Sequence, residues 1–136
     1  MITGGCRCGA VRFTVSEAPI VGRVCWCKDC QKFGAGGPSV GAAFKWAAVT
    51  VKGEMRDYES VADSGTRMHR RFCPVCGTHL FSQAEPRPHL VFIRAGALDD
   101  PEIAKPSSTI WTKSAPSWAC IDPHLPRMEG QPPPLA

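Results

Sequence analysis

Eight cysteines are the residues of this 136-residue chain whose type and spacing point to chemistry. They form three short motifs, C-x-C, C-x-C-x-x-C and C-x-x-C-G, and leave one residue alone. The motifs contain Cys6 and Cys8, then Cys25, Cys27 and Cys30, then Cys73 and Cys76, while Cys120 stands by itself. Closely spaced thiolates are ligands that Zn²⁺ binds tetrahedrally at about 2.3 Å, so the motifs indicate metal binding.

Disulfides are the competing explanation for so many cysteines. Residues 1–6 have neither the basic nor the apolar region of a signal peptide, and no apolar run is long enough to span a bilayer. We therefore expect a cytoplasmic protein with no membrane association. Disulfides are rare in that compartment, which favours metal.

The spacing alone leaves the pairing of the motifs open. Cys27 and Cys30 could join Cys73 and Cys76 in one ribbon-like site. Alternatively, the two simple pairs could join and leave the three-cysteine motif with its own metal. That second site could be closed by Cys120 as a fourth thiolate, or its thiols could remain without metal.

Short β-strands are the elements expected to position these motifs. Period-two alternation predicts a strand in which Val11, Phe13 and Val15 share one face, and an apolar run near residue 90 is typical of a buried strand. The predicted strands are 10–16, 48–53, 66–72, 78–82 and 89–95, of which the third and fourth flank the last cysteine motif as a hairpin. Short helical turns are predicted at 27–33 and 100–102, and 34–38 is interpreted as a lid or a tight turn.

The composition predicts one mainly-β domain with a modest core. Hydrophobic residues make up 43% of the chain, but 13 glycines and 13 prolines divide them among short segments. We assign the domain to residues 1–130 and an extended, proline-rich tail to 131–136. The net charge of +4 is compatible with an anionic small molecule or with ordinary surface charge, and it is milder than a dedicated nucleic-acid binder usually shows.

Polar residues near the third motif are further candidates for function. The segment Arg67–Arg71 is basic and could bind carboxylates, or it could be a solvated strand face. His69 and His79 could be general bases or metal ligands, or ordinary polar strand residues. A nucleic-acid surface would require one patch formed by Arg23, Arg67, Arg70, Arg71 and Lys113.

The three motifs and their contexts resemble the glutathione-dependent formaldehyde-activating enzyme family, also called the centromere-protein-V-like domain. The resemblance rests on Gly4–Phe13, Cys25–Lys32 and Phe72–Phe81, with Trp111 and Trp118 in a similar C-terminal pattern. It extends over about residues 4–130. Many members of the family have His at the position of Trp26, which we interpret as an aromatic wall beside the metal.

The resemblance implies a β-tent, or Mss4-like, fold of small antiparallel sheets around a structural zinc. It assigns that zinc to Cys6, Cys8, Cys73 and Cys76 and a second zinc to Cys25, Cys27 and Cys30, so two zinc ions per chain are expected. A three-ligand site keeps one coordination position open, which makes its three cysteines the expected catalytic centre.

The implied activity is that of a zinc-dependent carbon–sulfur lyase similar to S-(hydroxymethyl)glutathione synthase. Its partners would be a small-molecule thiol, glutathione in the family, and an aldehyde such as formaldehyde; a thiol bound to zinc loses its proton and adds to the carbonyl carbon. The alternative is a non-catalytic zinc module that binds a protein or nucleic acid, because a fold does not fix a function. An open three-thiolate site distinguishes the enzyme from such a module.

Overall fold

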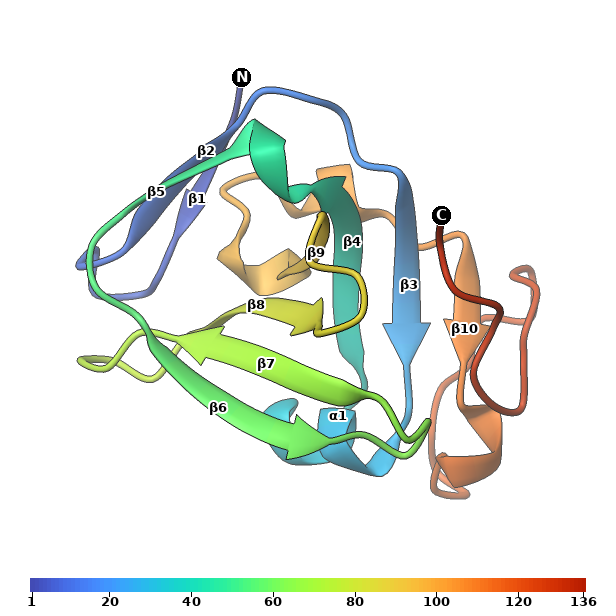
Figure 1. Ribbon diagram of the computed structural model, residues 1–136. Coiled ribbons are helices and arrows are strands. Elements are labelled where there is room, and N and C mark those ends of the chain that lie inside the picture. Colours follow the sequence, from blue (N-terminus) through green and yellow to red (C-terminus); the bar gives the residue numbers. More distant parts are fainter.

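Two β-sheets form the computed structural model, which describes residues 1–136 (Figure 1). The smaller sheet has the order β1-β2-β5 and consists of β1 (Ile2–Gly5), β2 (Arg12–Val15) and β5 (Val49–Lys52). The larger sheet consists, in spatial order, of β10 (Ser108–Ile110), β3 (Val21–Cys25), β4 (Ser39–Lys45), β9 (Leu90–Arg94), β8 (His79–Ala84), β7 (Arg67–Phe72) and β6 (Arg56–Val61). Only β10 and β3 pair in parallel, so the prediction of a mainly-β chain with antiparallel sheets is confirmed.

Helical structure is limited to short segments. Helix α1 (Lys28–Phe33) connects β3 to β4, and the 3-10 helices are Trp46–Ala48, Ala95–Ala97, Pro101–Ala104 and Thr112–Ser114. None of these helices has the length and apolar character needed to cross a membrane. The two predicted helical turns correspond to α1 and to the 3-10 helix that begins at Pro101.

The five predicted strands are present as β2, β5, β7, β8 and β9. The sequence patterns did not predict the other five strands, which are β1, β3, β4, β6 and β10. Three of them contain glycine, which sequence patterns treat as a sign of a turn. In β3 and β4, however, Gly22 and Gly41 lie within regular pairing.

The hydrophobic core lies between the two sheets. Val11, Phe13 and Val15 point inward from the smaller sheet, as the alternation predicted. Phe81 of β8 meets them from the larger sheet, with its ring 5.2 Å from that of Phe13 in an edge-to-face arrangement. Such burial of aromatic and branched side chains is the main stabilising term for a small domain.

The larger sheet is buried on one face and hollowed on the other. Ala42 and Ile93 are adjacent across β4 and β9 and lie in the core. The next row, shifted by one residue, is Arg23, Gly41 and Arg94, which must point to the opposite face. In Figure 1 the strands β6, β7 and β8 run across the direction of β3 and β4, so the sheet curves around that second face.

Candidate metal centres and the adjoining pocket

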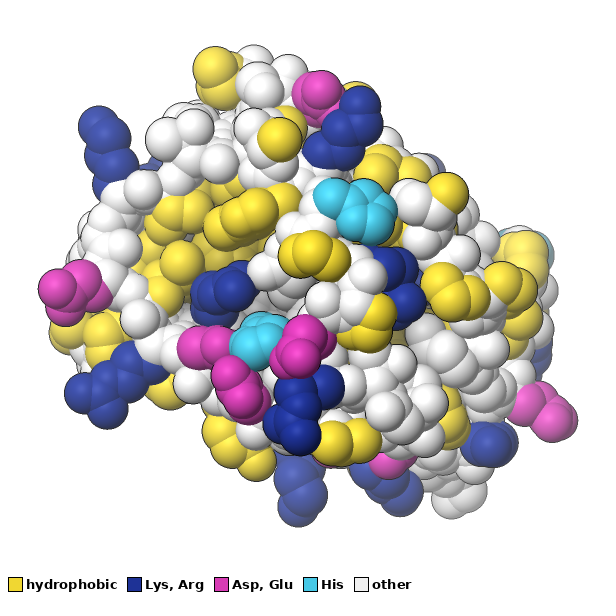
Figure 2. Space-filling model, viewed as in Figure 1, with side chains coloured by type: hydrophobic (Ala, Val, Ile, Leu, Met, Phe, Trp, Pro, Cys, Tyr) yellow, Lys and Arg dark blue, Asp and Glu magenta, His cyan; other side chains and the backbone are white.

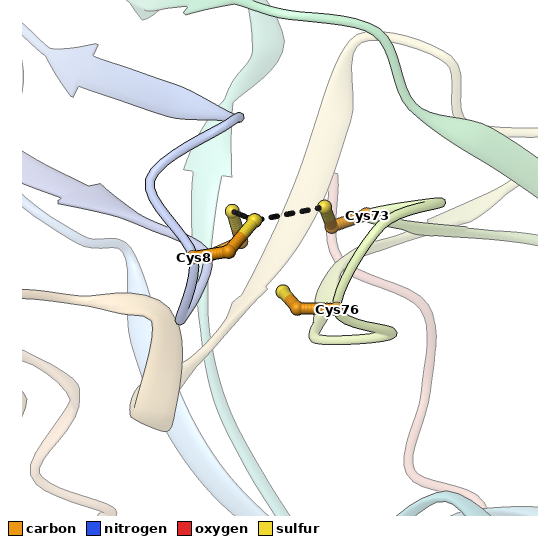
Figure 3. Close-up of side chains that lie close together, drawn as sticks. Cys8, Cys73 and Cys76 are labelled. Atoms are coloured by element: carbon orange, nitrogen blue, oxygen red, sulfur yellow. Dashed lines mark hydrogen bonds between the residues drawn. The ribbon is translucent and has the colours of Figure 1, made fainter.

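Four cysteines from two loops converge in the first candidate centre. Cys6 and Cys8 lie in the turn after β1, and Cys73 and Cys76 lie in the turn between β7 and β8. Their four sulfur atoms all lie within 4.8 Å of one another. Figure 3 shows the sulfur atoms of Cys8, Cys73 and Cys76 pointing toward one another from opposite loops.

The spacing of these sulfur atoms fits a thiolate-bound metal. Sγ of Cys8 is 3.6 Å from Sγ of Cys6 and 3.8 Å from Sγ of Cys73. A zinc tetrahedron with ligands at about 2.3 Å has edges of about 3.8 Å, whereas a disulfide needs about 2.05 Å. None of the cysteines is in a disulfide. The donor set and its spacing therefore match zinc.

Backbone and side-chain donors around the first centre favour thiolates. The amide of Val11 donates to Sγ of Cys6 at 3.2 Å, and the amide of Val75 donates to Sγ of Cys73 at 3.4 Å. Hydrogen bonds from the hydroxyl and the backbone of Thr78 lower the pKa of Cys76 to about 5. A thiolate, and not a thiol, is the metal ligand, so these donors suit the site.

The second candidate centre is built at the junction of β3 and helix α1. Cys25 ends β3, Cys27 is the N-cap of α1, and Cys30 lies in its first turn. Their sulfur atoms lie within 4.8 Å of one another, so the local chain alone assembles three thiols. The amide of Cys30 donates to Sγ of Cys27 at 3.3 Å, which is the capping bond that begins the helix.

The three thiols of the second centre have pKa values shifted in different directions. Hydrogen bonds from Cys25 and Cys27, together with the hydroxyl of Ser39, hold the pKa of Cys30 far below its usual value. The pKa of Cys25 shifts in the opposite direction, because its two thiol neighbours and its burial raise it. Three thiols that cannot all ionise without a cation are a donor set that fits Zn²⁺.

A pocket opens directly beside the second centre, on the hollow face of the larger sheet. Its walls include all three cysteines of that centre and four arginines, Arg23, Arg70, Arg87 and Arg94. Asp63 is the single carboxylate among the lining residues. Aromatic and apolar side chains complete the pocket, namely Phe33, Phe92, Ile110, Trp111 and Leu90 with the tail residues Pro133, Pro134 and Leu135. The pocket is therefore positive and partly apolar, and none of the four cysteines of the first centre lines it.

The tail is part of this pocket. Trp111 has a left-handed φ of 59°, which costs about 1–2 kcal/mol for a residue with a side chain. Its amide donates to the carbonyl of Gly130, and its indole Nε1 donates to Oε1 of Gln131 at 2.9 Å. The proline-rich residues then continue along the pocket, beside β10 in Figure 1.

The hairpin between β6 and β7 also lines the pocket. Its tip contributes Ala62, Asp63, Ser64 and Thr66 to the lining. Oδ2 of Asp63 accepts a 3.2 Å hydrogen bond from the amide of Lys28, the first residue of α1. The hairpin tip is thus attached to the same helix that carries Cys30, and a carboxylate at this end of a helix is electrostatically favourable.

The predicted histidines have different environments. His79 lines the pocket, where burial and Arg94 lower its pKa to about 4, so it is neutral near pH 7. His69 lies on the other face of the sheet in a cluster with Asp57 and Glu59. Figure 2 shows histidine, acidic and basic side chains gathered on the face of the molecule that it presents. Neither histidine belongs to a cysteine group.

The five basic residues proposed for a nucleic-acid surface do not form one patch. Arg70 is only 5% exposed and lines the pocket with Arg23. Arg71 stacks on Trp46, and Arg67 pairs with Glu59 and Glu85. The β7 strand therefore divides its arginines between the two faces of the sheet.

The structure also tests the predictions made for Cys120 and Trp26. Cys120 is exposed and outside both sulfur groups, so it does not close the second centre. Trp26 is absent from the pocket lining, contrary to the predicted aromatic wall. It is buried against Trp118, with the rings 6.5 Å apart, while Trp111 takes the place at the pocket.

Sequence reasoning missed Ser39, Arg87, Arg94 and the tail as parts of the site. The local pattern did not single out Arg94 at the end of β9, because β4 and β5 also end in a basic residue. Ser39, Arg87 and the tail become relevant only through pairing between distant strands, which the local sequence does not encode.

Comparison with known proteins gives a consistent result. The family model described as "Glutathione-dependent formaldehyde-activating enzyme" matches residues 1–114. A Halomonas elongata protein, provisionally named a glutathione-dependent formaldehyde-activating enzyme, is 30% identical over 129 residues, which cover 90% of this chain and 82% of that protein. A crystal structure of a Rhodobacter sphaeroides protein has a similar fold, with a TM-score of 0.56 at 22% identity over 71% of this chain and 87% of the other.

Proposed function

The chain belongs to the glutathione-dependent formaldehyde-activating enzyme family, and on that premise we propose that it is a zinc-dependent carbon–sulfur lyase. It would form and split the adduct of glutathione, or a similar anionic thiol, with an aldehyde. The observation that carries the proposal is the position of the three-cysteine centre in the wall of a positively charged pocket.

The two centres have different roles in this proposal. Cys6, Cys8, Cys73 and Cys76 would hold a structural zinc, because four thiolates complete a tetrahedron. Cys25, Cys27 and Cys30 would hold the second zinc and leave one position free. When bound there, zinc supplies Lewis acidity that lowers the pKa of an incoming thiol or polarises a carbonyl.

The arginines of the pocket would bind and orient the thiol substrate. Glutathione carries two carboxylates, and guanidinium groups pair with carboxylates through two parallel hydrogen bonds. Arg23 and Arg87 extend the positive lining away from the cysteines, and only Asp63 opposes it. The cation–π contact of Arg23 with Phe92, 5.5 Å from the ring centroid, keeps that guanidinium in place.

The reaction itself requires little movement of protons. The thiol loses its proton, the sulfur lone pair forms a bond to the carbonyl carbon, and the π pair of the carbonyl moves to oxygen, which then takes up one proton. In the reverse direction the hydroxyl proton leaves, the carbon–sulfur bond breaks and its electron pair returns to sulfur. Pro133, Pro134 and Leu135 line the pocket in which this reaction would take place.

A non-catalytic zinc module is a less economical explanation. Such a module requires closed metal sites, and the first centre already provides one. It has no use for three thiols that share a pocket with four arginines.

Exchange spectroscopy by NMR tests the proposed activity, because it measures the interconversion of glutathione and formaldehyde with their adduct at equilibrium. The wild-type protein and Cys120→Ser should both accelerate the exchange, since Cys120 lies outside both centres. Cys27→Ser should not accelerate it. Equal exchange rates with all three proteins and with buffer would refute the activity.

A further inference from the structure

Arg94 occupies a special place in the pocket. It ends β9 and is the cross-strand partner of Gly41 on β4, which in turn is the partner of Arg23 on β3. A Cβ atom at Gly41 would lie 2.8 Å from Nη2 and 3.0 Å from Cζ of Arg94. The guanidinium therefore lies across β4 in space that only a glycine leaves free, on the side of the sheet that carries Cys25.

The guanidinium of Arg94 has no protein partner for its charge. Its Nε is buried without a hydrogen bond, and none of the ion pairs of the structure includes this residue. Leaving a buried donor unsatisfied costs about 1–3 kcal/mol, and more for a charged group. Burial lowers the pKa of Arg94, and the nearby charges of Cys30 and Cys25 counteract that effect.

Arg70, the buried arginine of the pocket, has partners within the protein. Arg70 donates to Oγ of Ser60 at 2.9 Å and lies 3.7 Å from Oδ2 of Asp29. It also stacks on the ring of Phe33, at 5.1 Å from the centroid. Arg70 is thus held by the protein, whereas the half-buried Arg94 has no protein partner, and its Nε is a buried donor without a hydrogen bond.

We propose that Arg94 is a catalytic residue that donates hydrogen bonds to the substrate oxygen, the carbonyl oxygen of the aldehyde that becomes the hydroxyl oxygen of the adduct. The proposal rests on the proposed function, because it assigns an additional role in the same reaction. Sulfur attack on the carbonyl carbon moves the π electron pair to oxygen, and the fork of guanidinium N–H groups stabilises that developing negative charge. Arg94 keeps its own protons throughout, and the oxygen receives its proton from solvent.

The environment makes this role effective. A donor fixed before the reaction stabilises a transition-state charge without the reorganisation that water would require, and a buried site strengthens the interaction. Gly41 provides the fixed position, and the absence of a carboxylate partner leaves the donors available. The same guanidinium would also offset part of the negative charge of three thiolates, so the test must separate the two roles.

The kinetic test compares Arg94→Gln with Arg56→Gln, which removes the same charge from β6 outside the pocket. For Arg94→Gln we expect kcat to fall by about 10²–10³-fold, the usual cost of losing one such donor. The KM for glutathione and the zinc content should stay close to those of the wild-type protein. A loss of zinc at unchanged activity per bound zinc, or an unchanged kcat, would overturn the catalytic role.

A second variant moves the guanidinium without removing its charge. Gly41→Ala places a methyl group against Nη2 and Cζ, so kcat should fall while the net charge and the zinc content are retained. A wild-type kcat in Gly41→Ala would mean that the position of Arg94 is irrelevant to the reaction.

A binding measurement tests the site independently of activity. Formate, an oxyanion of the size of formaldehyde, should shift the ¹⁵N–¹H signal of Arg94 Nε in the wild-type protein, with a weaker shift in Gly41→Ala. The signal of Arg12, which is paired with Asp99, serves as the internal reference. Absence of a selective shift overturns the oxygen-binding site. A selective shift in a protein that fails the exchange assay would instead support the site and reject the proposed lyase function.

Discussion

The hydroxyl of Ser39 donates a 2.9 Å hydrogen bond to Sγ of Cys30 and thereby connects the start of β4 to helix α1. Ser39 is also the cross-strand partner of Cys25. One serine thus supports two of the three cysteines from a neighbouring strand. Groups of this kind orient metal ligands and adjust their basicity.

Replacing Ser39 with alanine should weaken metal binding at the second centre alone. The loss of the hydrogen bond to Cys30 should lower zinc affinity by about 10–100-fold, because outer ligand partners typically contribute that much. Competition with a chromophoric chelator measures the affinity of each zinc. Ser16→Ala is the control, because the hydroxyl of Ser16 donates to the carbonyl of Ala48, which belongs to neither centre. Equal affinities in the two variants would contradict the supporting role of Ser39.

The two centres should differ in their effect on stability. We expect two zinc ions per wild-type chain by elemental analysis and one in Cys27→Ser. Cys76→Ser should unfold or aggregate, because its centre joins two loops that are far apart in the sequence and structural zinc contributes about 10–16 kcal/mol in small peptides. Cys27→Ser should remain folded, since β3 and α1 are also held by the sheet.

Thermal melts and metal analysis of both cysteine variants check this prediction. An equal loss of melting temperature would show that the second centre is structural as well. A wild-type chain with a single zinc would contradict the open three-thiolate centre on which the proposed activity depends.

The sequence predicted correctly those elements whose hydrophobic pattern and turns lie within a few neighbouring residues. The alternation of Val11, Phe13 and Val15 and the hairpin around Cys73 and Cys76 are fully encoded in short windows. Strands β3 and β4 were missed because their glycines make room for distant parts of the chain, which a short window cannot reveal. Gly22 lies against the backbone of Ala104 and Lys105, and Gly41 lies against the side chain of Arg94. The pairing of the cysteine motifs likewise came from the resemblance, since their spacing was compatible with two arrangements.

The exposed cluster around His69 should make stability depend on pH. Its Nδ1 lies 2.6 Å from Oδ2 of Asp57 and its Nε2 lies 3.1 Å from Oε2 of Glu85, and these hydrogen bonds raise the pKa of His69. Glu59 adds a third negative charge, and Arg67 is the positive group of the cluster. Because the folded pKa exceeds the unfolded value of about 6.5, the stabilisation is complete below that value and is lost as pH rises through the folded pKa.

His69→Gln should therefore melt about 3 °C below the wild-type protein near pH 6 and at nearly the same temperature near pH 9. Differential scanning calorimetry at the two pH values measures the difference directly. A difference in melting temperature that increases with pH would contradict the stabilisation by a protonated histidine among carboxylates.

Deletion of residues 131–136 should open one wall of the pocket and leave the metal centres intact. Pro133, Pro134 and Leu135 would no longer line the pocket, and Trp111 would lose its partner Gln131. We expect the KM for glutathione to rise about tenfold, equivalent to about 1.4 kcal/mol, with an unchanged zinc content. Gln131→Ala retains the wall and should raise the KM less. A truncated protein with wild-type KM would show that the tail does not contribute to substrate binding.

The two centres also differ in when they can assemble. The ligands of the second lie within residues 25–30, so a growing chain possesses all of them long before the domain is complete. Cys8 and Cys73 are 65 positions apart, and closing a loop of that length costs about 4 kcal/mol of chain entropy. The four cysteines of the first centre can therefore come together only after the chain has been synthesised to Cys76 and the segments around Cys8 and Cys73 have met.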